Sequence, residues 1–195
     1  MTFDLSNGYG DSVATNRYQL PAGGYVCKIF RSIGTKSKQG RPMIVLHLDI
    51  AEGKFAGYFA RQTDWLRQKY NPATDWAFNG KRYQVIFDKT GQKPEWGLVQ
   101  TLEAVRKSNP DFAFDSKAFD PETLTGKLIG MVFGVVSYPR RNGSIGTNTA
   151  PIRAYSIDDI RAGNFEVPTP STIPENKPTN FAFGGQPVDD EDVPF

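Results

Sequence analysis

Two stretches near the start of the chain alternate apolar and polar residues, which is the pattern of a β-strand with one buried face. In residues 25–32, Tyr25, Cys27 and Ile29 are expected to face inward. Lys28 and Phe30 then share the outer face, because successive side chains of a strand point to opposite sides. In residues 43–51, the inner face is expected to carry Ile44, Leu46, Leu48 and Ile50, and the outer face Val45, His47 and Asp49.

Later stretches complete the predicted strands. Residues 55–62 follow a Glu-Gly-Lys turn and are predicted as the third strand, and residues 81–87 alternate well enough for an extra strand. Residues 128–138 form a long β-rich run, and its two glycines suit a strand that bends around a small barrel. Residues 149–156 are predicted as the last strand.

Helical spacing is clearest in residues 96–107, where apolar side chains recur every three or four positions. The sequence Ser108-Asn109-Pro110 predicts the end of that helix. Residues 63–80 are predicted as a short helix followed by a loop, and residues 157–162 as a helical turn that Gly163 ends. This order predicts a mainly β fold with one or two helices. It fits the OB-fold, a five-stranded Greek-key barrel, here with an insertion over residues 63–95.

The two ends of the chain differ from this domain, which we expect over residues 20–163. Residues 1–19 are polar and are predicted to form a flexible arm. Residues 164–188 space five prolines among Thr, Ser, Asn and Gly, which predicts a disordered linker. Residues 189–195 place four carboxylates before Val193-Pro194-Phe195. This acidic tip must lie in water, but solvation alone does not require its apolar end.

The net charge of +2 hides a division between the domain and the tail. Residues 164–195 hold six acids and one base, a net −5, which leaves 22 bases and 15 acids, a net +7, on the remainder. A basic body with an acidic tail indicates a polyanionic ligand for the body.

Several classes of protein do not fit the composition. One cysteine and one histidine provide neither a disulfide framework nor a zinc site of the usual Cys/His kind. The longest nearly apolar run, residues 128–136, is too short to span a bilayer, and no secretory signal is evident. We therefore expect a cytoplasmic protein that has no cofactor and does not contact a membrane.

The expected fold indicates where a nucleic acid would bind. OB-folds bind on the face of strands 2 and 3 and on the loops that join strands 1–2 and 4–5. Here those loops are residues 34–42 and 139–149, and both are basic and free of acids. Cations along a groove and aromatic platforms on a sheet are what a single-stranded nucleic acid requires. The candidate cations are Lys28, Lys36, Lys38, Arg41, Arg61, Arg140, Arg141 and Arg153, and the candidate platforms are Phe30, Tyr58, Tyr138 and Tyr155.

Other aromatic residues are expected to pack rather than bind. Phe59 and Phe133 are assigned to the core, and Trp65 and Trp76 to packing of the insertion. The single Cys27 and the single His47 fall on predicted strands and are also expected to be packing residues.

The acidic tip resembles the C-terminal tip of bacterial and phage single-stranded DNA-binding proteins (SSB), a run of Asp that ends in an apolar residue, Pro and Phe. The body resembles SSB-like proteins from phages and mobile elements of Gram-positive bacteria. Five motifs carry this second resemblance: Leu20-Pro21-Ala22-Gly23-Gly24-Tyr25, Leu48-Asp49-Ile50-Ala51-Glu52-Gly53-Lys54-Phe55, Ser108-Asn109-Pro110, Gly126-Lys127-Leu128-Ile129-Gly130 and Ile160-Arg161-Ala162-Gly163-Asn164-Phe165.

The resemblance implies a function. It implies sequence-nonspecific binding and protection of single-stranded DNA in replication, recombination and repair, at the nucleoid or replication fork, or in the host cytoplasm for a phage protein. It also implies capture of replication or recombination proteins by Asp189, Asp190, Glu191, Asp192, Val193, Pro194 and Phe195. Housekeeping SSB has nothing like residues 63–93, so its tetramer is not carried over, and the order of any homo-oligomer stays open.

Other readings of the sequence stay open. The chain fits an interaction module that mimics the SSB tip without binding DNA. Asp49, Glu52 and Lys54 form a D-x-x-E-x-K string similar to that of Mg²⁺-dependent nucleases. Binding of RNA is a third alternative, because stacking and phosphate contacts serve both polymers.

Overall fold

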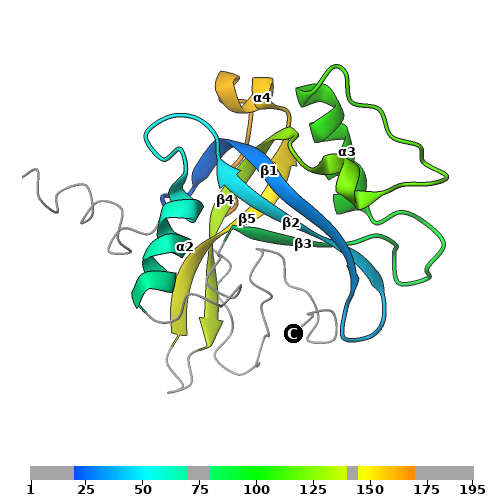
Figure 1. The fold of residues 1–195 in the computed structure, drawn as a ribbon, viewed down its shortest axis with the longest axis horizontal. Helices are drawn as coiled ribbons and strands as arrows, with labels where there is room; N and C mark the ends of the chain where they lie inside the picture. Colours follow the sequence, from blue (N-terminus) through cyan, green and yellow to red (C-terminus); the bar gives the residue numbers. More distant parts are fainter. Residues whose placement is uncertain (1–19, 70–79, 140–144, 170–195) are drawn as a thin grey trace, which may run out of the picture.

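The computed structural model describes residues 20–69, 80–139 and 145–169, and these residues form a mainly β fold (Figure 1). A single antiparallel sheet has the strand order β3-β2-β1-β4-β5. Its two outer strands, β3 and β5, also come into contact, so the sheet is curved like a barrel that backbone pairing does not close within the described residues. The strands are β1 (Gly23–Lys36), β2 (Pro42–Ile50), β3 (Lys81–Val85), β4 (Leu128–Pro139) and β5 (Ile145–Tyr155); the helices are α2 (Tyr58–Lys69), α3 (Trp96–Ser108), α4 (Ile157–Ala162) and the short 3-10 helix η2 (Pro121–Leu124).

One face of the sheet carries the core. Ile44, Leu46 and Leu48 of β2 are fully buried there, as their alternation predicts. Helix α3 adds Leu98 and Val105 to the same cluster. Burying an aliphatic side chain of this size stabilises the folded state by about 1.5–3 kcal/mol. The hydrophobic pattern therefore fixes which face of the sheet is covered.

Three further residues were expected to pack in the core, and the structure confirms all of them. Cys27, Phe59 and Phe133 are buried in this cluster. Burial raises the pKa of the Cys27 thiol, so this side chain stays protonated and packs as a small apolar group. The rings of Phe59 and Phe133 stack with their centroids 5.6 Å apart.

A β-bulge interrupts the alternation of β1. Ile29 pairs with Leu48 of β2, and the next pair joins Arg31 to His47, so Phe30 is an extra residue on β1. Phe30 and Arg31 are both exposed, and the strand returns to the core at the buried Ser32. The extra residue of a bulge shifts the alternation of a strand by one position. Two consecutive side chains of β1 therefore lie on the outer face.

The prediction of a third strand over residues 55–62 is wrong, because these residues lead into helix α2. Phe59, Gln62 and Thr63 are buried at the spacing of one helical face. The third strand is instead β3, which was predicted only as an extra strand. The helical insertion therefore lies between β2 and β3, whereas the sequence placed it after the third strand.

The seam between the two edge strands is bridged by a buried arginine. Arg82 of β3 is 2% exposed. Its Nη1 donates to the carbonyl oxygens of Pro151 at 3.3 Å and Ile152 at 2.6 Å, both on β5. Its Nη2 donates to Gln84 Oε1 at 3.3 Å, and Gln84 Nε2 donates to Glu95 Oε2 at 2.6 Å. We call this arrangement the Arg82 bridge.

Two features explain the Arg82 bridge. The register between β4 and β5 shifts between Val132 and Phe133, and this shift leaves Ile152 without a partner in the ladder. The guanidinium therefore satisfies the carbonyl group of Ile152, which has no partner in the ladder, and it also donates to that of Pro151. Burial lowers the pKa of Arg82 to about 10, so the side chain is still charged at neutral pH.

Strands β1 and β5 extend further into the two predicted basic loops than expected, while β4, α3 and α4 match their predictions closely. Helix α3 begins after Glu95, whose carboxylate accepts from the backbone N–H groups of Gly97 and Leu98, and it ends at Asn109 as expected. Helix α4 ends at Gly163, which has the positive φ of 75° that glycine adopts readily. No described helix is long and apolar enough to cross a membrane.

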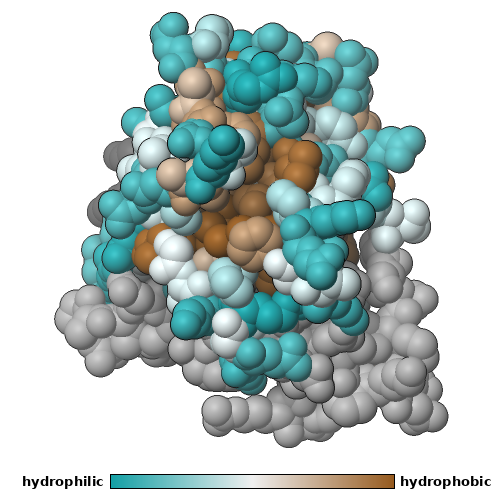
Figure 2. Space-filling model, turned by 90° about the vertical axis from the view of Figure 1, so that its right-hand side faces the viewer, coloured by the Kyte–Doolittle hydropathy of each residue, from teal (hydrophilic) through white to brown (hydrophobic). Residues whose placement is uncertain are grey.

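The surface on the α3 side differs from the rest. In Figure 1, α2 lies at the left of the strands and α3 at the right, and Figure 2 shows the α3 side with apolar side chains gathered in its centre inside a hydrophilic ring. Ile86, Phe114 and Phe119 are partly buried side chains that pack against the core. The predicted arm, the acidic tip and most of the linker lie outside the described residues.

Candidate nucleic-acid interface

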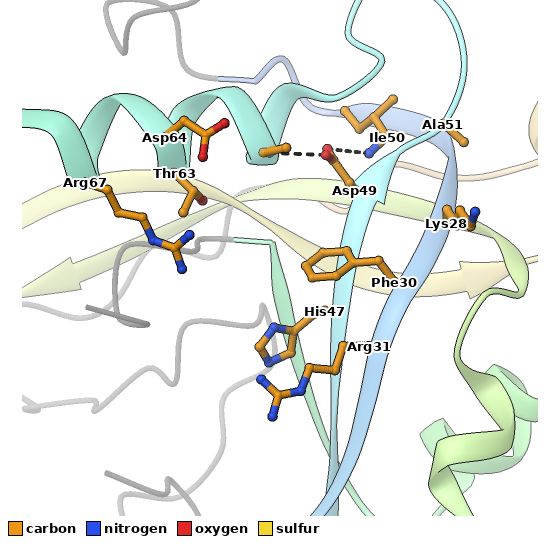
Figure 3. Close-up of a pocket in the computed structure, with 11 residues that line it drawn as sticks. Lys28, Phe30, Arg31, His47, Asp49, Ile50, Ala51, Thr63, Asp64 and Arg67 are labelled. Carbon is orange, nitrogen blue, oxygen red and sulfur yellow. Dashed lines mark hydrogen bonds between the residues drawn. The ribbon is translucent and has the colours of Figure 1, made fainter. Parts of the chain in front are cut away.

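A groove lies between the outer face of β1 and β2 and the side of helix α2 (Figure 3). Its volume is about 610 Å³, within the range of protein sites that hold small ligands. We call it the α2 groove. Its lining residues are Lys28, Phe30, Arg31, His47, Asp49, Ile50, Ala51, Ala60, Thr63, Asp64 and Arg67.

The strand side of the groove combines positive charge with an aromatic ring. Phe30 is 43% exposed although it is a large apolar residue. Lys28 and Arg31, on either side of it in β1, are exposed and have no hydrogen-bond or ion-pair partner among the described residues. The bulge places Arg31 beside Phe30 on this face. Two unpaired cations therefore flank an exposed aromatic platform.

His47 lies on the same face, one strand away. Its ring meets the Phe30 ring edge to face, with the centroids 5.7 Å apart. His47 was expected to be a packing residue, and it does pack against Phe30, but it is only half-buried and also lines the groove. Its contact holds the Phe30 ring in place, which lowers the entropy that the ring would lose on binding a ligand.

The helix side of the groove carries charges of both signs. Asp64 and Arg67 are three residues apart, so they lie on one face of α2. Figure 3 shows the Arg67 guanidinium extending from the helix toward the Phe30 ring on the strand side. Asp64 is exposed and, within the described chain, has neither a hydrogen bond nor an ion pair. The two sides thus differ in chemistry.

Asp49 joins strand β2 to helix α2 through hydrogen bonds. Its carboxylate accepts from the backbone N–H of Ile50 at 2.8 Å, of Phe59 at 3.0 Å and of Ala60 at 3.2 Å. The last two groups belong to the first turn of α2, where N–H groups have no partner within the helix. Asp49 is therefore a positioning residue that fixes the helix to the edge of the groove.

The other predicted cations with described positions lie outside the groove. Lys36 and Lys38 are exposed at the β1–β2 hairpin. Arg41 Nη2 donates to the carbonyl oxygen of Phe87 at 2.8 Å, and Arg61 Nη1 donates to that of Ala56. Arg153 lies on β5, while Arg140 and Arg141 lie outside the described residues. Of the predicted cations, the structure brings only Lys28 into the α2 groove.

The predicted aromatic platforms divide in the same way. Phe30 lines the groove, but Tyr58 packs against the core at the start of α2, and burial raises the pKa of its phenol. Tyr155 packs beside Phe165 with the ring centroids 6.4 Å apart, and Tyr138 is half-buried near the end of β4. Phe30 is thus the predicted platform that the groove contains.

Sequence reasoning missed four groove residues: Arg31, His47, Asp64 and Arg67. The alternation already placed His47 on the outer face, so its position was available as a signal. Arg31 was hidden by the bulge, because regular alternation after Ile29 would turn it inward. Asp64 and Arg67 fall in the short helix predicted within residues 63–80, but nothing in the sequence indicated that this helix lies beside the outer face of β1 and β2.

The three residues of the nuclease alternative, Asp49, Glu52 and Lys54, each contact a different group and do not form one site. Asp49 binds the start of α2, Glu52 Oε1 accepts from Arg161 Nη2 at 2.5 Å, and Lys54 Nζ lies 4.9 Å from the centroid of the Phe55 ring. In the part of the chain that the structure describes, no three His, Cys, Asp or Glu side chains gather as metal ligands would.

Comparison with other proteins adds no identification. No model of a known protein family matches this chain, and no curated protein sequence is significantly similar to it. The α2 groove and the acidic tip therefore carry the functional argument.

Proposed function

We propose that this protein binds single-stranded DNA without sequence specificity, along the outer face of an OB-type barrel that includes the α2 groove. The observation that carries the proposal is the exposed Phe30 between two unpaired cations, Lys28 and Arg31. A single strand offers unstacked bases and a flexible anionic backbone, and a nonspecific binder needs a platform for the former and cations for the latter.

The strand order supports an OB-type barrel. The order β3-β2-β1-β4 places the fourth strand beside the first after a long connection, which is the Greek-key arrangement. The OB-fold is a five-stranded, partly open barrel of this kind. Helix α3 lies between the third and fourth strands of the chain, where the sequence interpretation expects a helix in an OB-fold.

Three residues of β1 would make different contacts with the bound strand. A base stacked on Phe30 contributes roughly 1–3 kcal/mol. Lys28 and Arg31 would contact phosphates on either side of that base, and the resulting affinity would fall as salt rises. Neither interaction depends on base identity, which accounts for binding without sequence specificity. Such a protein acts in the cytoplasm, where single-stranded DNA appears during replication and recombination.

A titration tests the proposal directly. The full chain is mixed with a fluorescent oligo-dT of a few tens of nucleotides at several salt concentrations, with duplex DNA as the control. We expect tight binding to the single strand, with a log–log salt slope of roughly −0.7 per phosphate contact. Equal binding to the duplex, or no binding at low salt, would contradict the proposal. The latter result would favour the interaction module, and an RNA oligonucleotide tests the RNA alternative in parallel.

The acidic tip provides a second, separable part of the function. We expect that deleting residues 189–195 leaves DNA affinity unchanged or raises it, because four carboxylates no longer repel phosphates or compete for the basic groove. The same deletion should abolish capture of replication or recombination proteins, measured by pull-down with the full chain as the reference. A large loss of DNA affinity in the deletion variant would contradict the proposal that the tip captures proteins and does not contribute to DNA binding.

A further inference from the structure

We infer that the α2 groove takes in one base of the bound strand and prefers guanine, which Asp64 recognises through two hydrogen bonds. This inference rests on the proposed function, and it adds a preference for one base at a single position of a strand that is otherwise bound without regard to sequence. Its starting point is the inserted helix α2, which turns an open face of β1 and β2 into a groove with two unlike sides.

The charges of the two sides orient the strand. Phosphates are attracted to the two cations Lys28 and Arg31 on β1, while on α2 the carboxylate of Asp64 offsets the charge of Arg67. The backbone of the strand is therefore expected on the β1 side. A base that stacks on Phe30 then extends its polar edge toward the helix side, where Asp64 lies.

The chemistry of Asp64 selects among the bases. An ionised carboxylate has two acceptor oxygens and no donor. Guanine presents two parallel donors on one edge, N1–H and the 2-amino group, and so it matches both oxygens, as an arginine fork does. Adenine and cytosine present an amino group beside an acceptor nitrogen, and thymine presents one N–H between two carbonyl oxygens. Guanine is thus the base that satisfies the carboxylate completely.

A second residue of α2 favours the same base. Arg67 follows Asp64 by three residues on the same helical face, and its guanidinium extends into the groove. Guanine carries the acceptor O6 beside N1–H, and arginine is the side chain that most often contacts guanine acceptors. A donor next to the carboxylate therefore complements the edge of guanine, in which an acceptor adjoins two donors.

The experiment uses the full chain and measures base preference separately from binding. The shortest oligo-dT that still binds fully is determined first, so that few registers are open to the strand. In a series of variants of this oligonucleotide, guanine replaces one thymine at a time. Each variant is compared with the oligonucleotide that carries inosine at the same position, because inosine lacks the 2-amino group. We expect at least one position at which guanine binds at least about 10-fold more tightly than inosine, as one hydrogen bond to a charged group predicts.

The variant Asp64→Asn should lose this discrimination, because an amide replaces one acceptor oxygen with a donor. Its affinity for oligo-dT should rise rather than fall, because the substitution removes a carboxylate that repels phosphates in the groove. Asp111→Asn, at an exposed position that does not line the groove, is the matched control and should keep the preference.

Each outcome has a distinct meaning. Loss of binding to every oligonucleotide would overturn the proposed function and this inference together. Tight binding to oligo-dT with no difference between guanine and inosine would overturn the inference alone. Discrimination that survives in Asp64→Asn would show that another residue reads the base, which also contradicts it.

Discussion

Replacing Arg82 with alanine is expected to lower the free energy of unfolding by about 3–5 kcal/mol. The substitution removes the donors of two β5 carbonyl groups and of Gln84, and it leaves a cavity at a site that is 2% exposed. It also removes a positive charge that interacts with Glu95, the residue at the start of helix α3. Chemical denaturation followed by circular dichroism measures the change.

Arg82→Met separates the hydrogen bonds from the volume. Methionine fills much of the same space but has no donor, so we expect a smaller loss, about 1–3 kcal/mol, from the unsatisfied carbonyl groups. Lys117→Ala, at an exposed position, is the control and should change stability by less than about 0.5 kcal/mol. A methionine variant as stable as the unmodified protein would mean that the Arg82 bridge contributes no net stability.

Reversing two charges of the α2 groove is expected to weaken single-stranded DNA binding by roughly 100-fold or more at low salt. In the double variant Lys28→Glu/Arg31→Glu, two phosphate contacts are lost and two repulsions take their place. The log–log salt slope should become less steep by roughly 1.4, which is two contacts at 0.7 each. Both side chains are exposed, so folding should be preserved.

The matched control reverses two exposed cations that do not line the groove, in Lys107→Glu/Lys117→Glu. The two double variants have the same net charge, so a difference between them reports on position alone. We expect the control to lose less than about 10-fold in affinity, through the weaker overall field. Equal losses in the two variants would show that net charge governs binding and that the groove has no special part.

The faces of β1, β2 and α3 could be predicted because each depends on local periodicity. Ile44, Leu46 and Leu48 repeat every second residue, and a strand with one buried face requires this repeat. The end of α3 could be predicted because Pro110 disfavours the helical conformation of the residue before it.

The start of helix α2 could not be predicted because it depends on a distant contact. The residue that fixes its first turn, Asp49, lies ten residues before Phe59 on a neighbouring strand. In addition, Tyr58 and Phe59 are adjacent aromatic residues, which suit a strand when read without that contact. This tertiary contact also places the helix beside the outer face of β1 and β2, so Asp64 and Arg67 could not be predicted as groove residues.

The Arg82 bridge was beyond prediction for another reason. Arginine is almost never fully buried unless it is paired, and its partners here are carbonyl groups of a strand nearly seventy residues later. A sequence pattern cannot indicate that an interrupted ladder will leave those carbonyls unsatisfied. The opposite holds for the acidic tip. The sequence indicates its role, but the tip lies outside the described residues, so the structure does not test that role.

The bulge in β1 has a consequence for how the length of this chain can vary. Removing one residue from the middle of a regular strand turns every later side chain to the opposite face. At Phe30 and Arg31, by contrast, the loss of one residue would restore regular alternation and leave Ile29 and Ser32 facing the core. A shortened chain of this kind would keep its barrel but would present either an aromatic ring or a cation at that point, not both. The bulge is thus a position where an insertion or deletion changes the binding surface without changing the fold.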